Sequence, residues 1–422
     1  METMNIIAAV LFALALIHTF TAKSFERLAH HSPKHKGLFH LLGEIEVVFG
    51  LWAAILIVFM AFVLGGNAAL EYAETRHYTE PLFVFVIMVV AASRPILEAV
   101  KSAVGVIAGI APVRTAVMRV WLCLSLVPLF GSLITEPAAM TLAALMLAPL
   151  VFRQSTPEWL KYGAMGVLFV NISIGGTLTH FAAPPVLMVA ATWGWDTPFM
   201  AATFGWKAAI AVLVNGTVIT FLLSKHLTDE ADRQASSRSG SSKVPFTISL
   251  VHMLFLLGVV IFAHHPVIFM GLFLFFIGFT TAYPEHQSPL ILKEGLLVGF
   301  FLAGLVVLGG MQQWWLQPIV SSLEPVSLFW GATALTAITD NAALTYLGSL
   351  IQGMSDEAKY MLVAGAVAGG GLTPIANAPN PAGVALLKGG FSEGTISIGA
   401  LVLGALGPTA MTCLMFLLFR PA

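Results

Sequence analysis

The 422-residue chain has few charged residues and only two cysteines, and both shortages narrow the class of protein. Asp, Glu, Lys and Arg make up 10% of the sequence, whereas an ordinary soluble domain carries about 25%. A water-soluble fold of this composition would expose too much apolar surface, so a soluble protein is excluded. Cys123 and Cys413 lie in apolar segments and are expected to be small buried residues, not a disulfide or a metal pair.

Enzyme motifs and a strong charge of either sign are also lacking. The metalloprotease pattern HExxH, the phosphate-binding Walker loop and the redox pair CxxC do not occur. The sequence therefore predicts no enzyme and no cofactor. The formal net charge is −1, so nothing in the composition favours a nucleic-acid partner.

Long hydrophobic runs are abundant instead. Hydrophobic residues make up 58% of the chain, and the mean hydropathy is +0.90. A helix that spans a bilayer needs about 20 apolar residues, and four runs approach or exceed that length: Asn5–Phe20, Leu41–Leu64, Met200–Leu223 and Ser397–Phe419. The segment before the first run has no Lys or Arg, so we expect a retained membrane helix rather than a signal peptide. The fold class predicted is an all-α polytopic membrane protein.

A pair of motifs occurs twice, once in each half of the chain. In each copy an acidic residue interrupts an apolar run, and a break rich in Gly, Thr and Pro interrupts the next run. The acids are Glu136 and Asp340, and the breaks begin at Gly175 and Gly369. A charged side chain within a membrane is costly and marks a functional site by default. Two such sites at matching positions are typical of transporters built from repeats.

The chain is predicted to fold as two inverted repeats, residues 1–223 and 246–422, joined by a cytoplasmic linker at 224–245. Each repeat is expected to have about five membrane spans, including one broken helix, plus one re-entrant hairpin. The hairpins are placed at about 115–152 and 327–351, and the broken helices at about 162–191 and 360–387. Non-helical backbone at membrane depth is tolerated only where protein or a water-filled cavity surrounds it.

The positive charges predict the orientation. With the amino terminus outside, 16 of the 20 Lys and Arg residues fall on the cytoplasmic side, which agrees with the positive-inside rule. We therefore expect a multi-pass protein of a bacterial-type cytoplasmic (inner) membrane, with both termini extracytoplasmic.

The chemistry of the motifs suits a small cation. Hard cations bind carboxylate, hydroxyl, amide and carbonyl oxygens, and helix breaks expose such groups. The predicted ion-binding residues are Glu136, Asp340, Thr135, Thr141, Thr179, Thr339, Asn341, Thr345, Thr373 and Asn377. Glu136, Asp340 and Asn341 are the predicted sodium ligands. The alternatives are that the threonines bond to their own helices and that the glycines serve close packing. A role for His180, Glu44, Glu46 or Glu98 stays open.

These motifs resemble the ion transporter superfamily, which includes divalent-anion/sodium symporters, arsenite pumps and NhaD-type sodium/proton antiporters. The segment from Ser173 to Pro185 is similar to the family's broken helix, and Thr339-Asp340-Asn341 is similar to its Asp-Asn hairpin tip. The resemblance implies two hairpins and two broken helices around a central site. It also implies an elevator-like transport domain and a homodimer.

The chain departs from the dicarboxylate branch, because both hairpin tips carry an acid and would repel a dicarboxylate. We therefore expect a secondary active transporter that exchanges sodium, or lithium, for protons. A carboxylate whose proton affinity changes on ion binding can couple the two ions. The alternatives are an anion, organic-acid or arsenite carrier coupled to protons or sodium, an ion channel, and a membrane-embedded enzyme. The partner expected is a small inorganic ion.

Overall fold

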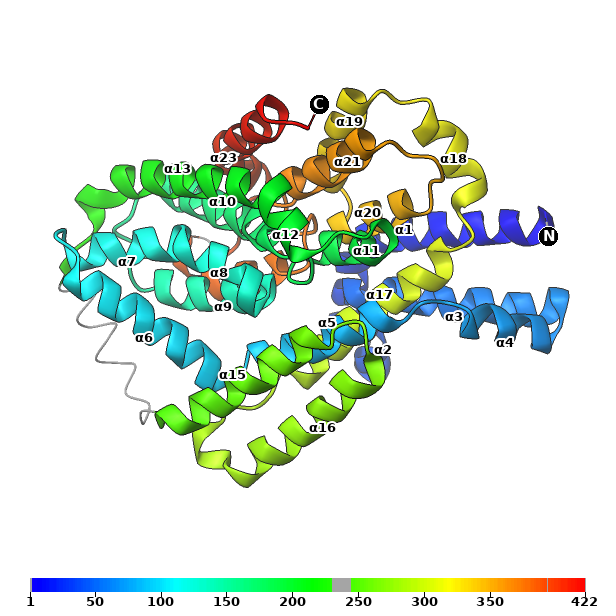
Figure 1. Cartoon of the computed structure of the whole chain (residues 1–422), viewed down its shortest axis with the longest axis horizontal. Helices are drawn as coiled ribbons and strands as arrows, with labels where there is room; N and C mark the ends of the chain where they lie inside the picture. The colour runs from blue at the N-terminus through cyan, green and yellow to red at the C-terminus, as the bar shows by residue number, and fades with distance from the viewer. Residues whose placement is uncertain (1, 230–243, 393, 422) are drawn as a thin grey trace.

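The computed structural model describes residues 2–229, 244–392 and 394–421. These residues form helices and connecting loops and contain no β-strand, as expected for an all-α membrane protein (Figure 1). Most of the predicted cytoplasmic linker, residues 230–243, lies outside the described part of the chain.

The first half of the chain consists of long helices, short helices and helical turns. They are α1 (Glu2–His31), η1 (Pro33–His35), α2 (Lys36–Gly43), α3 (Ile45–Leu64), α4 (Gly66–Glu74), α5 (Thr79–Ala91), α6 (Arg94–Ile110), α7 (Thr115–Leu124), α8 (Leu126–Ile134), α9 (Glu136–Leu147), α10 (Glu158–Gly175), η2 (Gly176–Leu178), α11 (Pro184–Trp193), α12 (Thr197–Met200), the π-helical turn η3 (Ala201–Gly205), α13 (Trp206–Leu223) and η4 (Ser224–His226).

The second half begins with two long apolar helices and ends with another. Its elements are α15 (Phe246–Ile261), α16 (Pro266–Ala282), η5 (Pro284–His286), α17 (Leu292–Gly309), α18 (Gln313–Ser321), α19 (Pro325–Thr336), α20 (Asn341–Ser349), α21 (Asp356–Gly369), α22 (Asn380–Leu387), η6 (Lys388–Gly390) and α23 (Ile398–Leu418).

Within the described residues, five helical segments are long and apolar enough to cross a membrane, and two bent pairs would raise the number to seven. The five are Glu2–Ala22, Ile45–Leu64, Thr197–His226, Leu292–Gly309 and Ile398–Leu418. The four long runs of the sequence coincide with four of them. The expectation of a multi-pass helical protein is therefore confirmed, whereas the inverted repeats and the re-entrant hairpins stay predictions.

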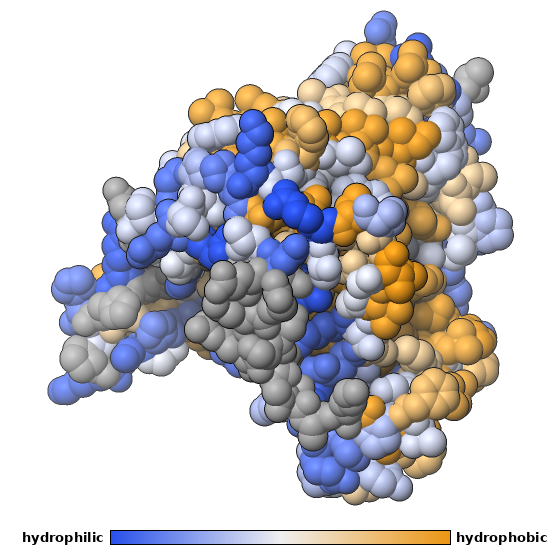
Figure 2. All heavy atoms as spheres, turned by 90° about the vertical axis from the view of Figure 1, so that its left-hand side faces the viewer, coloured by the Kyte–Doolittle hydropathy of each residue, from blue (hydrophilic) through white to orange (hydrophobic). Residues whose placement is uncertain are grey.

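The outward faces of several apolar helices carry exposed hydrophobic side chains. Phe62 on α3 and Val267 on α16 are each 87% exposed, and Figure 2 shows hydrophobic residues along two edges of one face, beside a hydrophilic area. Large apolar side chains on an outer surface need a non-aqueous environment or a partner. A lipid bilayer supplies that environment for a chain with several spanning helices.

Two pairs of consecutive helices are sharply bent. Helices α5 and α6 meet at 61°. The first part of the predicted 115–152 hairpin divides into α7 and α8, which meet at 44° beside Ser125. Pro128 has no N–H to bond the carbonyl of Leu124, four residues earlier. The side-chain amide of Asn171 donates to that carbonyl instead, at 2.6 Å.

The interrupted segments of the two halves pack against each other. Helix α11, which follows the first break, contacts α20, which begins after Asp340. Helix α22, which follows the second break, contacts α9, which begins with Glu136. Each break therefore lies beside the acidic motif of the other half.

Candidate functional site

Glu136 is the first residue of α9 and is completely buried. The preceding residue, Thr135, has φ 76°, the only positive φ of a non-glycine residue in the part of the chain described. Pro137 follows at a helix-start position, where its missing N–H costs no hydrogen bond. The sharp turn at Thr135 and the proline together place an acidic side chain at a helix start inside the protein.

The Glu136 carboxylate contacts two segments distant in sequence. The side-chain amide of Asn377, in the second break, donates to Oε2 of Glu136 at 2.8 Å. Oε1 faces Gly176 in the first break and has no hydrogen-bond partner among the described residues. A Cβ atom at position 176 would lie 2.5 Å from Oε1, so only glycine leaves room for the carboxylate there. Glu136 forms no ion pair with a described residue.

Several buried polar atoms around the two motifs have no hydrogen-bond partner within the described chain. They are Thr135 Oγ1, Glu136 Oε1, Thr336 Oγ1, Asn341 Oδ1 and Nδ2, Asn377 Oδ1 and Asn380 Oδ1. Most buried polar groups in folded proteins are hydrogen-bonded. The concentration of oxygen atoms at the motifs is what a site for a small cation requires.

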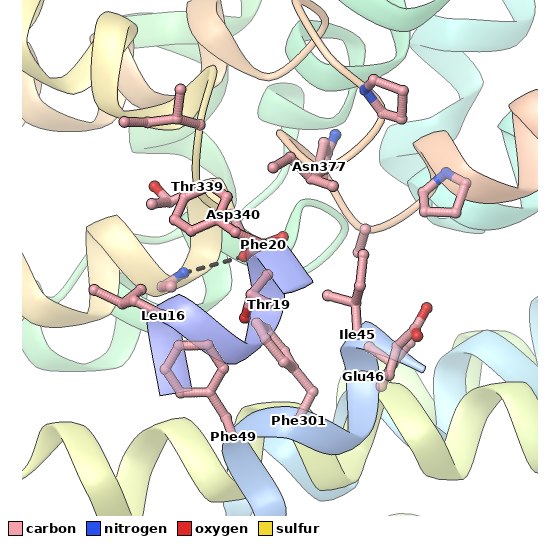
Figure 3. Close-up of a pocket in the computed structure, with 17 residues that line it drawn as sticks. Leu16, Thr19, Phe20, Ile45, Glu46, Phe49, Phe301, Thr339, Asp340 and Asn377 are labelled. Carbon is pink, nitrogen blue, oxygen red and sulfur yellow. Dashed lines mark hydrogen bonds between the residues drawn. The ribbon is translucent and has the colours of Figure 1, made fainter. Parts of the chain in front are cut away.

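Asp340 has a structural role and also a position suited to binding. Its Oδ1 accepts hydrogen bonds from the backbone N–H groups of Ala342 at 2.8 Å and Ala343 at 3.1 Å. These bonds cap the start of α20. The side chain is only partly buried and lines a small pocket with a volume of about 50 Å³ (Figure 3).

The pocket lies between two groups of elements. Its walls come from α1, α3 and α17 on one side and from the loops before α20 and α22 on the other. The polar side chains that line it are Thr19, Glu46, Thr339, Asp340 and Asn377, without a Lys, Arg or His. Asn377 belongs both to this pocket and to the hydrogen bond with Glu136.

The site thus combines three acidic residues, Glu46, Glu136 and Asp340, with several oxygen acceptors and a pocket that no basic side chain of the described residues lines. Residues 3–419 match the model of a family described as "Putative Na+/H+ antiporter". The chain belongs to this family. No curated protein matches it in sequence. The match covers nearly the whole chain and supports a multi-pass transporter for cation/proton antiport.

Most of the threonines predicted to bind the ion in this member of the antiporter family instead donate hydrogen bonds that stabilise the fold. Thr339 donates to Leu335 O at 2.8 Å and Thr345 donates to Asn341 O at 3.2 Å, each within its own chain segment. Thr179 donates to Ser132 O and Thr373 to Ala337 O, both at 2.8 Å. Thr141 lies on α9 and is not among the pocket-lining residues. Of the threonines predicted as ligands, Thr135 alone has a buried hydroxyl without a hydrogen-bond partner among the described residues. The ligand role of all of them stays a prediction.

Asn341 is placed differently from Asp340. It is fully buried, and neither atom of its side-chain amide has a hydrogen-bond partner among the described residues. Its backbone N–H donates to Ala376 O at 3.1 Å, which fixes the loop before α20 to the second break. A Cβ atom at Gly370 would lie 2.9 Å from Nδ2 of Asn341, so the amide packs closely against that break.

Two residues near the candidate site, Ser132 and Glu46, were not among the ion-binding residues predicted from the sequence. Ser132 donates to Gly175 O at 2.7 Å and accepts from Leu178 N–H at 3.0 Å, which joins α8 to the first break. A serine one turn before an acidic motif is a weak signal on its own. Glu46, whose role was left open, lines the pocket with Asp340.

No group of three or more His, Cys, Asp or Glu side chains that could hold a metal ion occurs in the described ranges. A sodium ion would therefore need amide, hydroxyl or carbonyl oxygens beside one or two carboxylates, which hard cations accept readily. Thr135, Asn341 and Asn377 supply such oxygens around Glu136 and the two breaks. The transported cation is the substrate of such a site, not a resident cofactor.

Proposed function

We propose that the protein exchanges sodium, or lithium, for protons across a bacterial-type cytoplasmic membrane. The observation that carries the proposal is the environment of Glu136. Its carboxyl group is fully buried, is bonded only to the amide of Asn377, and has no basic partner in the described chain. An isolated buried carboxylate is very costly. The group is stable when it holds a proton or when a cation lies beside it, and competition between these two occupants couples their transport.

The polar lining of the pocket supports a cation rather than an anion. Glu46, Asp340 and Asn377 offer carboxylate and amide oxygens, and no Lys, Arg or His of the described chain lines the pocket. Two carboxylates would repel an anion at short range. An anion, organic-acid or arsenite carrier is therefore the weaker reading, and the experiment below tests it directly.

An elevator-like movement would give the site access to both sides of the membrane. The hairpins and broken helices would form a mobile body, because backbone and side-chain bonds join their tips: Asn341 N–H to Ala376 O, and Thr373 Oγ1 to Ala337 O. Helices α1, α3 and α17 would form the stationary body, and the pocket lies between the two. We also propose that the two halves are inverted repeats, because the motif pair occurs once in each. The distribution of positive charges supports extracytoplasmic termini, and the family resemblance supports a homodimer.

Purified protein in liposomes tests the proposal. The liposomes would hold a pH dye and an acidic interior, and sodium, lithium and potassium would be added outside in turn. We expect sodium or lithium to drive proton efflux from the liposomes. Glu136→Gln is the matched control, because glutamine keeps the volume and an oxygen that can accept from Asn377, but has no titratable charge.

Proton efflux driven by one cation and lost in Glu136→Gln would support antiport and identify the ion. Normal exchange in the folded variant would contradict the role of Glu136. If no cation drives efflux, the function is not cation/proton antiport, and arsenite and small carboxylates would be tested as substrates.

A further inference from the structure

Glu46 is an acidic residue on the α1, α3 and α17 side of the pocket. It lies in the first turn of α3, is partly buried and lines the pocket opposite the loop that carries Asp340 (Figure 3). Glu46 and Asp340 therefore line the same pocket from its two opposite walls. Glu44, two residues earlier, forms an ion pair with Lys293 at 2.8 Å. Glu46 forms no ion pair with any described residue, so its charge is available to the pocket.

A second observation points to a cation in the same pocket. Asn377 is 1% exposed and lines the pocket, and its Oδ1 has no hydrogen-bond partner among the described residues. The pocket therefore brings together oxygen acceptors from α3, from the loop before α20 and from the second break. Oxygen acceptors without a competing basic group are the ligands that a hard cation takes.

Glu46 is attached to a tightly packed pair of helices. Helix α3 meets α17 where Gly50 and Gly304 touch, since a Cβ atom at position 304 would lie 2.3 Å from the backbone nitrogen of Gly50. Phe49 and Phe301 pack edge to face with ring centroids 5.2 Å apart. Backbone contact through glycines is a common way to lock membrane helices together. Glu46 therefore stays with α3 and α17 when other elements move.

Asp340 and Asn377 belong to the opposite wall of the pocket. Their loops are joined to each other by the Asn341 N–H bond to Ala376 O, at 3.1 Å. Asn377 is also tied to α9 through Glu136. If this wall moves against α3 and α17, Glu46 faces Asp340 in only one of the two access states.

We infer that Glu46 is a ligand for the transported monovalent cation in only one of the two access states. In the state described here, its carboxylate attracts and contacts the cation next to Asp340 and Asn377. In the other state the cation moves together with Asp340 and Asn377, and it no longer contacts Glu46. The inference rests on the proposed function, because it needs a transported cation and a movement between two states. Its consequence is that Glu46 sets the apparent affinity at one membrane face.

Membrane vesicles of opposite orientation test this inference with the full chain. The apparent KM for sodium in sodium-driven proton exchange would be measured in inside-out and right-side-out vesicles. We expect Glu46→Gln to raise the KM about tenfold at one face and to leave the other within about twofold, as the loss of one nearby charge predicts. Glu46→Asp should keep most of the affinity because it keeps the charge.

Glu44→Gln is the matched control. It removes a neighbouring acid that is already paired with Lys293, so both KM values should stay as in the wild type. A KM raised equally at both faces by Glu46→Gln, or unchanged at both, would overturn the inference while leaving antiport itself intact. If the wild type shows no cation-driven exchange at either face, the proposed function fails and the inference falls with it.

A binding measurement keeps the test decisive if a variant inserts poorly. Sodium should raise the melting temperature of the purified wild-type protein in detergent. The same rise should need more sodium for Glu46→Gln than for Glu44→Gln or Glu46→Asp. An identical sodium dependence in all four proteins would contradict a cation contact by Glu46.

Discussion

The side-chain amide of Asn377 donates a 2.8 Å hydrogen bond to Oε2 of Glu136, across 241 residues of sequence. The two residues come from opposite halves of the chain, one from the second glycine-rich break and the other from the first acidic motif. The repeated motifs therefore do not form two separate sites. They meet, and the amide of one half holds the carboxylate of the other next to a pocket that Asn377 also lines.

The first prediction concerns that bond. Asn377→Ala leaves a buried carboxylate oxygen without its donor, which should cost about 1–3 kcal/mol of folding free energy. It also removes the buried, unpartnered Oδ1 of a residue that lines the pocket, so the apparent KM for sodium should rise more than the maximal exchange rate falls. The sodium dependence of proton exchange in liposomes measures both quantities.

Asn215→Ala is the control for Asn377→Ala. Asn215 is a buried amide that donates to Asn171 Oδ1 at 3.0 Å, and it is not among the residues that line the pocket. We expect a lower melting temperature with an unchanged KM. If the two alanine variants change KM equally, Asn377 acts through general stability and not through ion binding.

The helix interruptions at the two acidic motifs were predictable from the sequence because their signal is local. Glu136 and Asp340 interrupt apolar runs beside a proline or an asparagine, and the structure begins a helix at or directly after each acid. The long apolar helices were predictable for the same reason, since hydropathy depends on neighbouring residues alone.

Contacts between distant segments could not be predicted in this way. Nothing near Asn377 in the sequence indicates that it bonds to Glu136 rather than to Asp340. The bend at Ser125 depends on Asn171, whose amide satisfies a carbonyl that Pro128 leaves free. Glu46 resembled any acid at the end of a membrane helix, and only the packing of α3 beside the loop of Asp340 places it in the pocket.

The second prediction separates the two roles of Asp340. Asparagine caps helices about as well as aspartate, whereas alanine costs about 0.5–2 kcal/mol at such a position. Asp340→Asn should therefore keep the melting temperature and lose coupled exchange. Asp340→Ala should lose both, because the bonds from Ala342 and Ala343 disappear together with the charge. Melting curves and the liposome assay compare the variants, and normal exchange by folded Asp340→Asn would exclude this residue from the transport cycle.

The third prediction uses the backbone of Thr135. A β-branched residue with φ 76° and ψ 151° is strained, and such conformations cost about 1–3 kcal/mol. Thr135→Gly should relieve the strain and raise the melting temperature. The Thr135→Gly variant also lacks the buried, unpartnered Oγ1, and this should raise the KM for sodium.

Thr135→Ala distinguishes these effects, because alanine also lacks the hydroxyl but keeps a Cβ atom. We expect the same rise in KM without the gain in stability. A melting temperature that does not rise for Thr135→Gly would show that the turn is not strained. A KM that stays the same in both variants would remove Thr135 from the ion-binding residues.

The fourth prediction concerns the space that Gly176 leaves for Glu136. A Cβ atom at this position would lie 2.5 Å from Oε1 and 2.9 Å from Cγ of Glu136. In the Gly176→Ala variant the side chain of Glu136 must therefore rotate away, which disturbs its hydrogen bond to Asn377. We expect the rate of cation/proton exchange to fall at least about tenfold, as misplacement of an essential group by a fraction of an ångström can do.

Gly109→Ala on α6 is the control, because a Cβ atom there meets nothing within 4 Å. Since alanine favours helices over glycine by about 1 kcal/mol, this variant should be as stable as the wild type or more so, with unchanged exchange. A second change tests the mechanism itself. Glu136→Asp shortens the acid by one methylene group and should restore part of the exchange when combined with Gly176→Ala, although it lowers exchange alone. If the double variant is no more active than Gly176→Ala, the glycine is needed for a reason other than space for the carboxylate.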